Sequence, residues 1–450
     1  MNDTNFLLIA DPHYFDTSLG CSGKEYDDFM HYEQKCFAET ESINKSVFEF
    51  LKNHETDIIL FDGDLTFNGE RKSHESFIKH LYDLKNHGKK IYVLTADHDY
   101  CPDPFAFSDS GRYSPEGVKR EELIGLYKDF GFSQAVSVHT DSLSYTADLS
   151  DDVRLFALNA DKKIGNQHGF CEDQIEWIKE QAQKAREDKK TVVAMCHYPI
   201  LAGQPIFSLV SSIMFKDTYE TASFLADEGI HLVFTGHMHN HSINEYVSAK
   251  GNKFYDVTTG SIIADPAYMR LVTVCGDAAR IESVPTPDFD FDTGGKPCKQ
   301  YLTELFDRMI VNLITDMAHD TKRAMRKLGI KEKNAVELAV RLGGKIICGI
   351  KLGTLSRLLF IKCDKSIRKM RLLDYSAELV RDVFKGNQSF KEGTPKGDVF
   401  LHFLKRINPV LKRINLKNPD GTKSDLFEIL KHTAGNYGID DYNTTLELKG

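Results

Sequence analysis

The chain has 450 residues, of which 41% are hydrophobic and 11% aromatic, so a folded core is expected and general disorder is excluded. The net charge of −9 is distributed unevenly between the two parts of the chain. Residues 296–450 carry 30 Lys and Arg against 18 Asp and Glu, a net +12, which leaves −21 for residues 1–295. The opposite charges favour association of the two parts, and the acidic part makes nucleic acid an unlikely partner.

Targeting signals are not expected. The first ten residues have no basic n-region and no small-residue cleavage site. No apolar stretch reaches the ~20 residues that a membrane-spanning helix needs, since the nearest, 342–363, contains Lys345, Lys351, Arg357 and Lys362. Nine cysteines, never in CxxC spacing, indicate reduced thiols. We therefore predict a cytoplasmic protein without a transmembrane segment.

The first part of the chain alternates short apolar runs with helix-period segments. The runs, predicted to be buried strands, are 6–10, 57–61, 91–95, 153–158, 191–196 and 231–235. Apolar residues at helical spacing lie at 43–51, 77–84 and 175–178. This rhythm predicts a layered α/β domain over residues 1–285. A turn-rich connector, 286–297, follows, and residues 298–450 are predicted to form a mostly α-helical domain, with helices at 302–326, 334–342 and 366–384.

Five of the predicted strands are followed at once by carboxylates or imidazoles. The residues are Asp11 and His13, Asp62 and Asp64, Asp97, His98 and Asp99, His197, and His237 and His239. In α/β sheets, ligands bind beyond the carboxyl ends of the strands. Because carboxylates and imidazoles crowded together would repel one another or stay unsatisfied without a cation, we predict a metal site there.

The residue types indicate which metals and which chemistry. Oxygen and imidazole ligands without cysteine suit Mn²⁺, Fe or Zn²⁺. Seven ligands are too many for one tetrahedral ion. Two ions bridged by a carboxylate form the arrangement that hydrolyses phosphate esters, because they lower the pKa of a bridging water and polarise the phosphoryl oxygens. The sequence therefore predicts a two-metal hydrolase that needs no side-chain nucleophile and acts on a small phosphoester.

These blocks resemble those of the calcineurin-like metallophosphoesterase superfamily, whose pattern is D-x-H, G-D, G-N-H-[DE], a lone H and G-H-x-H. The matching segments, in the same order, are Asp11-Pro12-His13, Gly63-Asp64, Ala96-Asp97-His98-Asp99, His197 and Gly236-His237-Met238-His239. The resemblance implies a two-sheet sandwich flanked by helices. It also implies that Asp11, His13 and His239 hold one metal, that Asp97, His197 and His237 hold the other, and that Asp64 bridges them. His98 would face the scissile phosphate, and Asp99 would orient His98.

The sequence departs from the family pattern at two positions. Ala96 replaces a glycine, which is tolerable if the turn does not need a positive φ. Asp97 replaces an asparagine and adds a full negative charge. We expect this charge to tighten the second metal, weaken its Lewis acidity and repel an anionic substrate. Asn68, Asn240 and His241 flank the blocks and are predicted to hydrogen-bond near the site rather than to hold metal.

The substrate is predicted from resemblance. The Gly63-Asp64-Leu65-Thr66 segment and the Gly169, Gln174 and Trp177 block look most like those of bacterial cyclic-nucleotide phosphodiesterases, some of which also carry a helical appendage. We therefore expect hydrolysis of cyclic nucleotides or similar small diesters. A phosphomonoesterase or nucleotidase is the alternative. A metal-binding scaffold without catalysis is a third possibility, which the presence of His98 and Asp99 disfavours.

The basic helical part has several possible roles. It could contact an acidic membrane surface or nucleic acid. It could instead pack on the acidic domain as a partial lid, or form a homo-oligomer through its helices. We favour packing or oligomer formation, because its basic residues are interspersed with Leu, Ile and Phe at core spacing.

Overall fold

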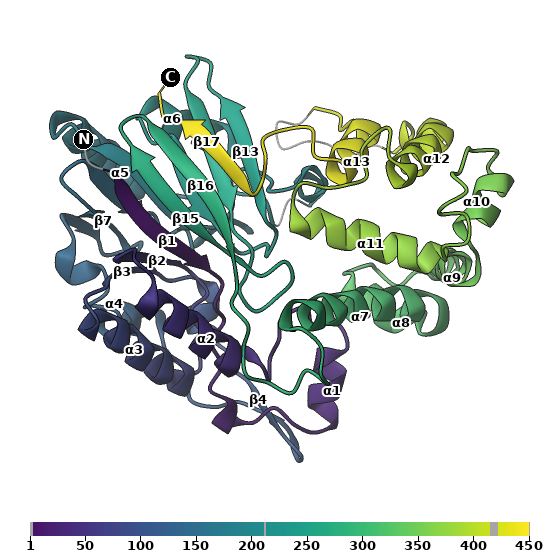
Figure 1. Ribbon diagram of the computed structural model, residues 1–450, viewed down its shortest axis with the longest axis horizontal. Helices are drawn as coiled ribbons and strands as arrows, with labels where there is room; N and C mark the ends of the chain where they lie inside the picture. The colour runs from purple at the N-terminus through teal and green to yellow at the C-terminus, as the bar shows by residue number, and fades with distance from the viewer. Residues whose placement is uncertain (1–2, 211–212, 415–421, 450) are drawn as a thin grey trace.

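Two β-sheets lie face to face in the computed structural model, which describes residues 3–210, 213–414 and 422–449 (Figure 1). The six-stranded sheet has the order β17-β16-β15-β1-β2-β3, and the seven-stranded sheet has the order β13-β14-β12-β11-β8-β7-β6. The first contains β1 (Thr4–Ala10), β2 (Ile58–Asp62), β3 (Lys90–Leu94), β15 (Tyr268–Cys275), β16 (Ala278–Pro285) and β17 (Asn443–Glu447). The second contains β6 (Ser137–His139), β7 (Ser144–Asp148), β8 (Val153–Ala157), β11 (Thr191–His197), β12 (Leu232–Thr235), β13 (Ser242–Val247) and β14 (Lys253–Thr258).

Successive side chains of each strand point to opposite faces of the sheet, and this alternation explains the layers. In β1, Phe6 and Leu8 point between the sheets and pack with residues of the other sheet such as Phe234. Leu7 and Ile9 point outward. Such strands are buried on both faces, which is why they read as continuous apolar runs. The predicted two-sheet sandwich is confirmed.

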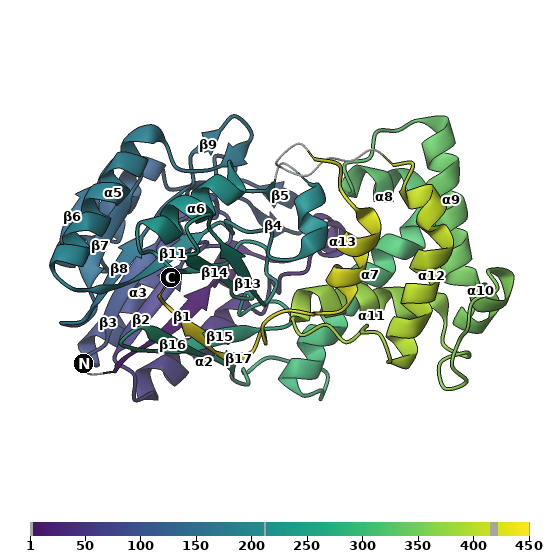
Figure 2. The ribbon, with the colours of Figure 1, turned by 90° about the horizontal axis from the view of Figure 1, so that it is seen from above.

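Helices cover the outer face of each sheet. The amphipathic α2 (Thr40–Asn53) and α3 (Arg71–Asn86) bury Ile43, Val47 and Phe77 against the six-stranded sheet. In the same way α5 (Glu172–Glu187) and α6 (Thr218–Asp227) cover the seven-stranded sheet (Figures 1 and 2). The shorter elements are α1 (Lys24–Met30), α4 (Leu123–Leu126), and the strand pairs β4 (Ala106–Ser108) with β5 (Gly111–Tyr113) and β9 (Lys163–Ile164) with β10 (Gln167–His168).

Parallel pairing brings the polar strand ends together. β1, β2 and β3 are parallel in the first sheet, and β8, β11 and β12 are parallel in the second. Each of the six predicted strands is present, with ends within one or two residues of those expected. The carboxyl ends of these strands therefore meet at one edge of the sandwich.

Residues after the connector form the predicted helical part. Its helices are α7 (Cys298–His319), α8 (Thr321–Lys327), α9 (Asn334–Gly349), α10 (Leu352–Leu358), α11 (Leu372–Lys385), α12 (Pro395–Leu411) and α13 (Leu426–Ala434). The predicted helix 302–326 is divided in two, because the Asp320 side chain accepts a hydrogen bond from the backbone N–H of Arg323 and caps α8. Among the described helices, none has the length and apolar character needed to cross a bilayer.

The last strand returns to the sandwich. β17 pairs antiparallel with β16, so residues 443–447 lie in the six-stranded sheet rather than among the helices (Figure 1). Just before it, the Asp441 carboxylate accepts a hydrogen bond from the backbone N–H of Ile243, 2.7 Å away. The fully buried Arg270 donates to the Asp441 carbonyl. A division of the chain at 286–297 stays a prediction, and the two parts are joined by this returning segment.

Candidate metal centre

Six of the seven predicted ligands lie in two clusters. Asp11, His13 and His239 form one, and Asp64, His197 and His237 form the other. Within each cluster the candidate ligand atoms are all within 4.8 Å of one another. They come from the ends of β1, β2, β11 and β12, which is where the sheet topology places strand ends side by side.

Distances show that the two clusters adjoin. The Nε2 atoms of His13 and His239 are 3.0 Å apart, and the Asp11 Oδ1 atom lies 3.3 Å from His239 Nε2. The Asp64 Oδ2 atom lies 3.3 Å from His197 Nε2 and 3.7 Å from His13 Nε2. Asp64 therefore stands between the clusters, within reach of both.

The backbone at these ligands is in a conformation that side chains rarely adopt. Asp11, His13, Asp64, His197, His237 and His239 have φ values between 39° and 62°. They make up half of the twelve non-glycine residues with positive φ in the described chain. Each such residue costs of order 1–3 kcal/mol, and such strain gathers at functional sites. The strained residues coincide with the predicted ligands, so the conformation serves the site.

Two glycines are required by close approach to the ligands. A Cβ atom at Gly63, where φ is 76°, would lie 2.4 Å from Nδ1 of His197. A Cβ atom at Gly236 would lie 2.3 Å from Oδ2 of Asp11. The backbone N–H of His237 donates to the same Asp11 carboxylate, at 3.0 Å from Oδ2. The glycines of these blocks therefore make room for the ligand side chains.

Gly236→Ala is expected to weaken metal binding at least about tenfold, comparable to the loss of a group that orients a ligand, because the added methyl group displaces the Asp11 carboxylate. Titration of metal-free protein with Mn²⁺ measures this. Gly125→Ala in α4 is the matched control, since a Cβ atom there meets nothing within 4 Å. Equal affinity of the two variants would show that Asp11 does not bind metal.

Hydrogen bonds fix the orientation of two histidine rings. His197 Nδ1 donates to the carbonyl of Asp62 over 2.8 Å, and the backbone N–H of His197 donates to the Asp62 carboxylate. His239 Nδ1 lies 2.6 Å from the side-chain amide of Gln34. In both rings Nδ1 is engaged and Nε2 faces its cluster. Such partners fix the tautomer and orientation of metal-binding histidines.

The charges of the site favour a cation. Burial lowers the pKa of His13 well below its usual value, and Lys35 adds to this. Burial would also lower the pKa of His197, but the Asp64 and Asp11 carboxylates outweigh it and raise that pKa well above its usual value. A positive charge is thus stabilised between Asp64 and His197.

Unpartnered buried atoms fit a metal as well. Asp97 Oδ1 is buried and makes no hydrogen bond, and His197 Nε2 is buried with the Asp64 carboxylate 3.3 Å away. Leaving a polar atom buried without a partner costs about 1–3 kcal/mol. The donor set of carboxylate oxygens and imidazole nitrogens, with no thiol, is the one that Mn²⁺, Fe and Zn²⁺ accept. The residues present therefore fit a pair of such ions.

Asp97 is the predicted ligand that lies outside the two clusters. Its backbone N–H donates to the Tyr198 hydroxyl, 3.0 Å away, and its negative charge acts on both His98 and His237. Asp97 therefore lies beside the second cluster. The preceding Ala96 has φ −138°, an ordinary extended value, so this turn does not need the usual glycine.

His98 and Asp99 lie at the site, but Asp99 does not orient His98 as the resemblance implied. His98 Nδ1 donates to the carbonyl of Phe67 over 2.6 Å, and the ring centre lies 4.9 Å from that of His13. The Asp99 carboxylate accepts hydrogen bonds from the backbone N–H groups of Ala96 and Thr66. These two donors hold Asp99 in the turn, so the Phe67 carbonyl takes the orienting role.

Several residues near the site were not identified from the sequence. Gln34 and Lys35 come from the long segment before α2, where no pattern marks them. Tyr198, which follows His197 directly, stacks on His168 with ring centres 3.6 Å apart. By contrast, the flanking residues predicted to hydrogen-bond near the site bond to other parts of the fold. Asn68 bonds the Asp103 carbonyl, Asn240 bonds Ser242, and His241 bonds Ser283.

Comparison with family models agrees with this geometry. The family model of the calcineurin-like phosphoesterases matches residues 4–241, more than half of the chain. No curated protein matches the chain. Similar solved structures include a dimetal phosphatase from Danio rerio (12% identity, TM-score 0.45, covering 63% of this chain and 96% of that one). Another is the purple acid phosphatase PPD1 from yellow lupin seeds (13% identity, TM-score 0.44, covering 64% of this chain and 52% of that one). A third is a putative 5'-nucleotidase from Staphylococcus aureus (12% identity, TM-score 0.38, covering 68% of this chain and 58% of that one). The chain belongs to the calcineurin-like phosphoesterase family of metal-dependent hydrolases.

Proposed function

We propose that this protein is a phosphodiesterase that hydrolyses small diesters, such as cyclic nucleotides, at a pair of metal ions. In this proposal Asp11, His13 and His239 hold one ion, Asp97, His197 and His237 hold the other, and Asp64 contacts both. The ions supply a water of lowered pKa and neutralise the phosphoryl oxygens when they are bound. The position of the Asp64 carboxylate, between two Asp/His clusters, carries the proposal.

His98 is the residue proposed to act on the phosphate. Its Nδ1 atom is committed to the Phe67 carbonyl, so Nε2 is the nitrogen left for the substrate. Burial and Lys35 hold the pKa of His98 below its usual value, although Asp64 and Asp97 act in the opposite direction. A bound phosphate adds negative charge beside the ring and favours protonation of Nε2. His98 is then placed to protonate the leaving oxygen.

The charge of the site favours a phosphodiester over a phosphomonoester as the substrate. A diester carries one negative charge at neutral pH, and a monoester carries close to two. Asp97 adds a carboxylate where the family pattern has a neutral asparagine, and Asp11 and Asp64 already lie at the site. A dianion is repelled more strongly by this set than a monoanion.

The cyclic-nucleotide assignment rests on family resemblance. Of the residues that carry it, Gln174 donates to Ser144 and to the Asn159 carbonyl, and Trp177 donates to Ser137. Both therefore support the seven-stranded sheet rather than contact the metal clusters.

Nine free cysteines support a reducing compartment such as the cytoplasm.

A substrate panel tests the proposal. The protein, reconstituted with Mn²⁺, is assayed on 2',3'- and 3',5'-cyclic nucleotides, bis-p-nitrophenyl phosphate, p-nitrophenyl phosphate and nucleoside 5'-monophosphates. We expect kcat/KM to be at least about tenfold higher on diesters than on matched monoesters. Higher activity on the monoesters would establish the phosphomonoesterase or nucleotidase alternative. Metal binding without turnover on any substrate would indicate a scaffold.

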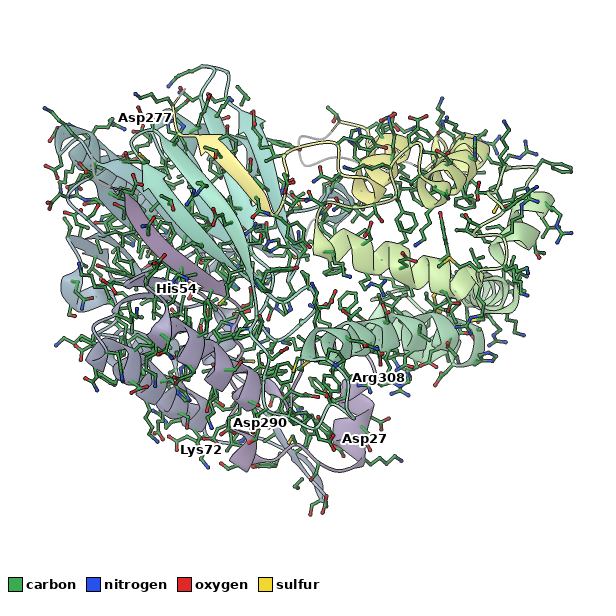
Figure 3. All side chains as sticks on the ribbon, viewed as in Figure 1. Asp27, His54, Lys72, Asp277, Asp290 and Arg308 are labelled. Carbon is green, nitrogen blue, oxygen red and sulfur yellow. The ribbon has the colours of Figure 1, made fainter. Side chains whose placement is uncertain are left out.

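Asp97→Asn is expected to change metal preference and to keep equal or higher turnover under saturating metal. Removing the extra charge should also favour monoesters, so the ratio of diester to monoester activity should fall several-fold. Asp277→Asn is the control, since Asp277 lies in the turn between β15 and β16, at the end of the sheet opposite Asp11 (Figure 3). A clear loss of turnover at saturating Mn²⁺ would mean that the Asp97 carboxylate has a positive role in catalysis.

A further inference from the structure

Large apolar side chains are exposed at the end of the molecule farthest from the sheets. α9 and the segment after it, through α10, form this end in both views (Figures 1 and 2). Leu338, Leu342 and Ile346 recur every four residues on one face of α9 and are 56%, 52% and 50% exposed. Leu358 and Phe360, at the end of α10 and just beyond it, are 66% and 88% exposed. We call these five residues the apolar tip.

Phe360 occupies a strained position that glycine usually takes. The N–H of Ile361 donates to the carbonyl of Ser356, and the N–H of Phe360 donates to that of Arg357. This pattern is a Schellman motif, whose left-handed residue is most often glycine. Phe360 has φ 55° there. An 88% exposed phenylalanine on a strained backbone contributes nothing to the fold of one chain, which points to a partner outside it.

Basic residues surround the apolar tip. Residues 331–371 contain 11 Lys and Arg against 3 Asp and Glu, a net charge of +8. Among the ion pairs that the described chain forms, Arg341 pairs with Glu337 and Arg371 pairs with Asp374. The other nine cations of this segment have no such partner. Exposed apolar side chains within an excess of Lys and Arg are typical of segments that lie on anionic lipid.

An apolar groove adjoins the tip. It has a volume of about 320 Å³ and lies between α9, α10, α11 and α12. Ile346 lines the groove and also belongs to the apolar tip, and Ile347, Leu355, Leu379 and Phe403 line it further in. The groove extends the exposed apolar surface into the helical part, where an acyl chain can be accommodated.

Two other partners fit the surface less well. A second copy of the chain would place one +8 segment against another, which is electrostatically unfavourable. Nucleic acid would be attracted by the charge, but a phosphate backbone gains nothing from Leu338, Leu342 or Phe360. An anionic bilayer satisfies both features, since its head groups attract the cations and its hydrocarbon accepts the apolar side chains.

We propose that the apolar tip docks on an anionic lipid surface. The charge division of the chain orients the protein there, because residues 296–450 carry +12 and residues 1–295 carry −21. The helical part faces the bilayer, and the acidic sheets with the metal clusters are held away from it. This docking is separate from the proposed reaction and does not depend on it.

Co-sedimentation with vesicles tests the docking. The full chain is mixed with vesicles of phosphatidylcholine alone, or of phosphatidylcholine with phosphatidylglycerol. We expect it to sediment with the anionic vesicles, and less so as salt is raised. Phe360→Gly with Leu358→Ser should weaken this binding at least about tenfold. Lys362→Glu with Lys365→Glu should weaken it by at least as much.

The controls keep folding and catalysis apart from docking. Glycine at position 360 relieves the backbone strain, so the fold is preserved. Val247→Ser changes a 49% exposed apolar side chain on β13, and it should bind vesicles as the unmodified protein does. Turnover of a soluble substrate should be the same in all these variants.

Five results would overturn the proposal. The first three are no binding to anionic vesicles, equal binding to neutral vesicles, and normal binding by the tip variants. The fourth is a dimer, seen by light scattering, that Phe360→Gly dissociates, which would identify the surface as a subunit interface. Binding of a DNA oligonucleotide in preference to vesicles would point to nucleic acid and likewise exclude lipid.

Discussion

Replacing Asp64 by asparagine is expected to lower turnover by at least roughly 10³-fold, more than the loss of one stabilising hydrogen-bond donor usually costs. The Asp64 Oδ2 atom lies 3.3 Å from His197 Nε2 and 3.7 Å from His13 Nε2, so one carboxylate serves both clusters. Asn lacks the negative charge and the second oxygen acceptor. The variant should also hold less metal than variants of the outer ligands. Turnover and metal content, measured on the same preparation, check this.

Asp256→Asn is the matched control for this change. Asp256 is also a fully buried carboxylate, on β14, and it accepts hydrogen bonds from Thr235 and from the backbone N–H of Leu201. Its replacement should cost stability but leave the metal content unchanged. If Asp64→Asn retains both metals and near-normal turnover, Asp64 does not bridge them.

His98→Ala is expected to retain metal and to lose roughly 10²–10⁴-fold in rate on substrates with alkoxide leaving groups, the usual contribution of a general acid. The ring is held by the Phe67 carbonyl and not by a metal-binding contact, so its loss should leave the clusters intact. The loss should be much smaller for a nitrophenyl diester, whose leaving group needs little protonation. Rates of both substrates with the same enzyme check this.

His231→Ala controls for the loss of an imidazole elsewhere. His231 precedes β12 and bonds the carbonyl of Lys253, at the opposite end of that strand from His237. An equal loss on both substrates in His98→Ala would show that His98 stabilises phosphoryl charge instead of protonating the leaving group. Loss of metal in this variant would identify His98 as a ligand.

The sequence was sufficient to predict what depends on strand ends. Apolar runs followed by Asp and His specify both the parallel strands and the residues at their carboxyl ends, so Asp11, His13, Asp64, His197, His237 and His239 could be grouped before the structure was known. The close approach of the His197 and Asp11 side chains explains why Gly63 and Gly236 accompany them.

Features that depend on long-range packing could not be predicted. Gln34 reaches His239 from a loop whose neighbours His31 and Tyr32 both bond Asp316 of α7, 285 and 284 residues away in sequence. Asp99 is adjacent to His98 in sequence, but the turn directs its carboxylate to backbone N–H groups. In the helical part, core spacing predicted burial, whereas Leu338, Leu342 and Ile346 are half exposed. Spacing alone identifies a helix face, not what covers it.

The central claim is that the two Asp/His clusters bind two metal ions. Elemental analysis of folded protein, reconstituted with Mn²⁺ or Fe and freed of excess metal, tests it most directly. We predict two ions per chain in the unmodified protein and fewer in Asp64→Asn. A stoichiometry near zero in protein shown to be folded by circular dichroism would contradict the account.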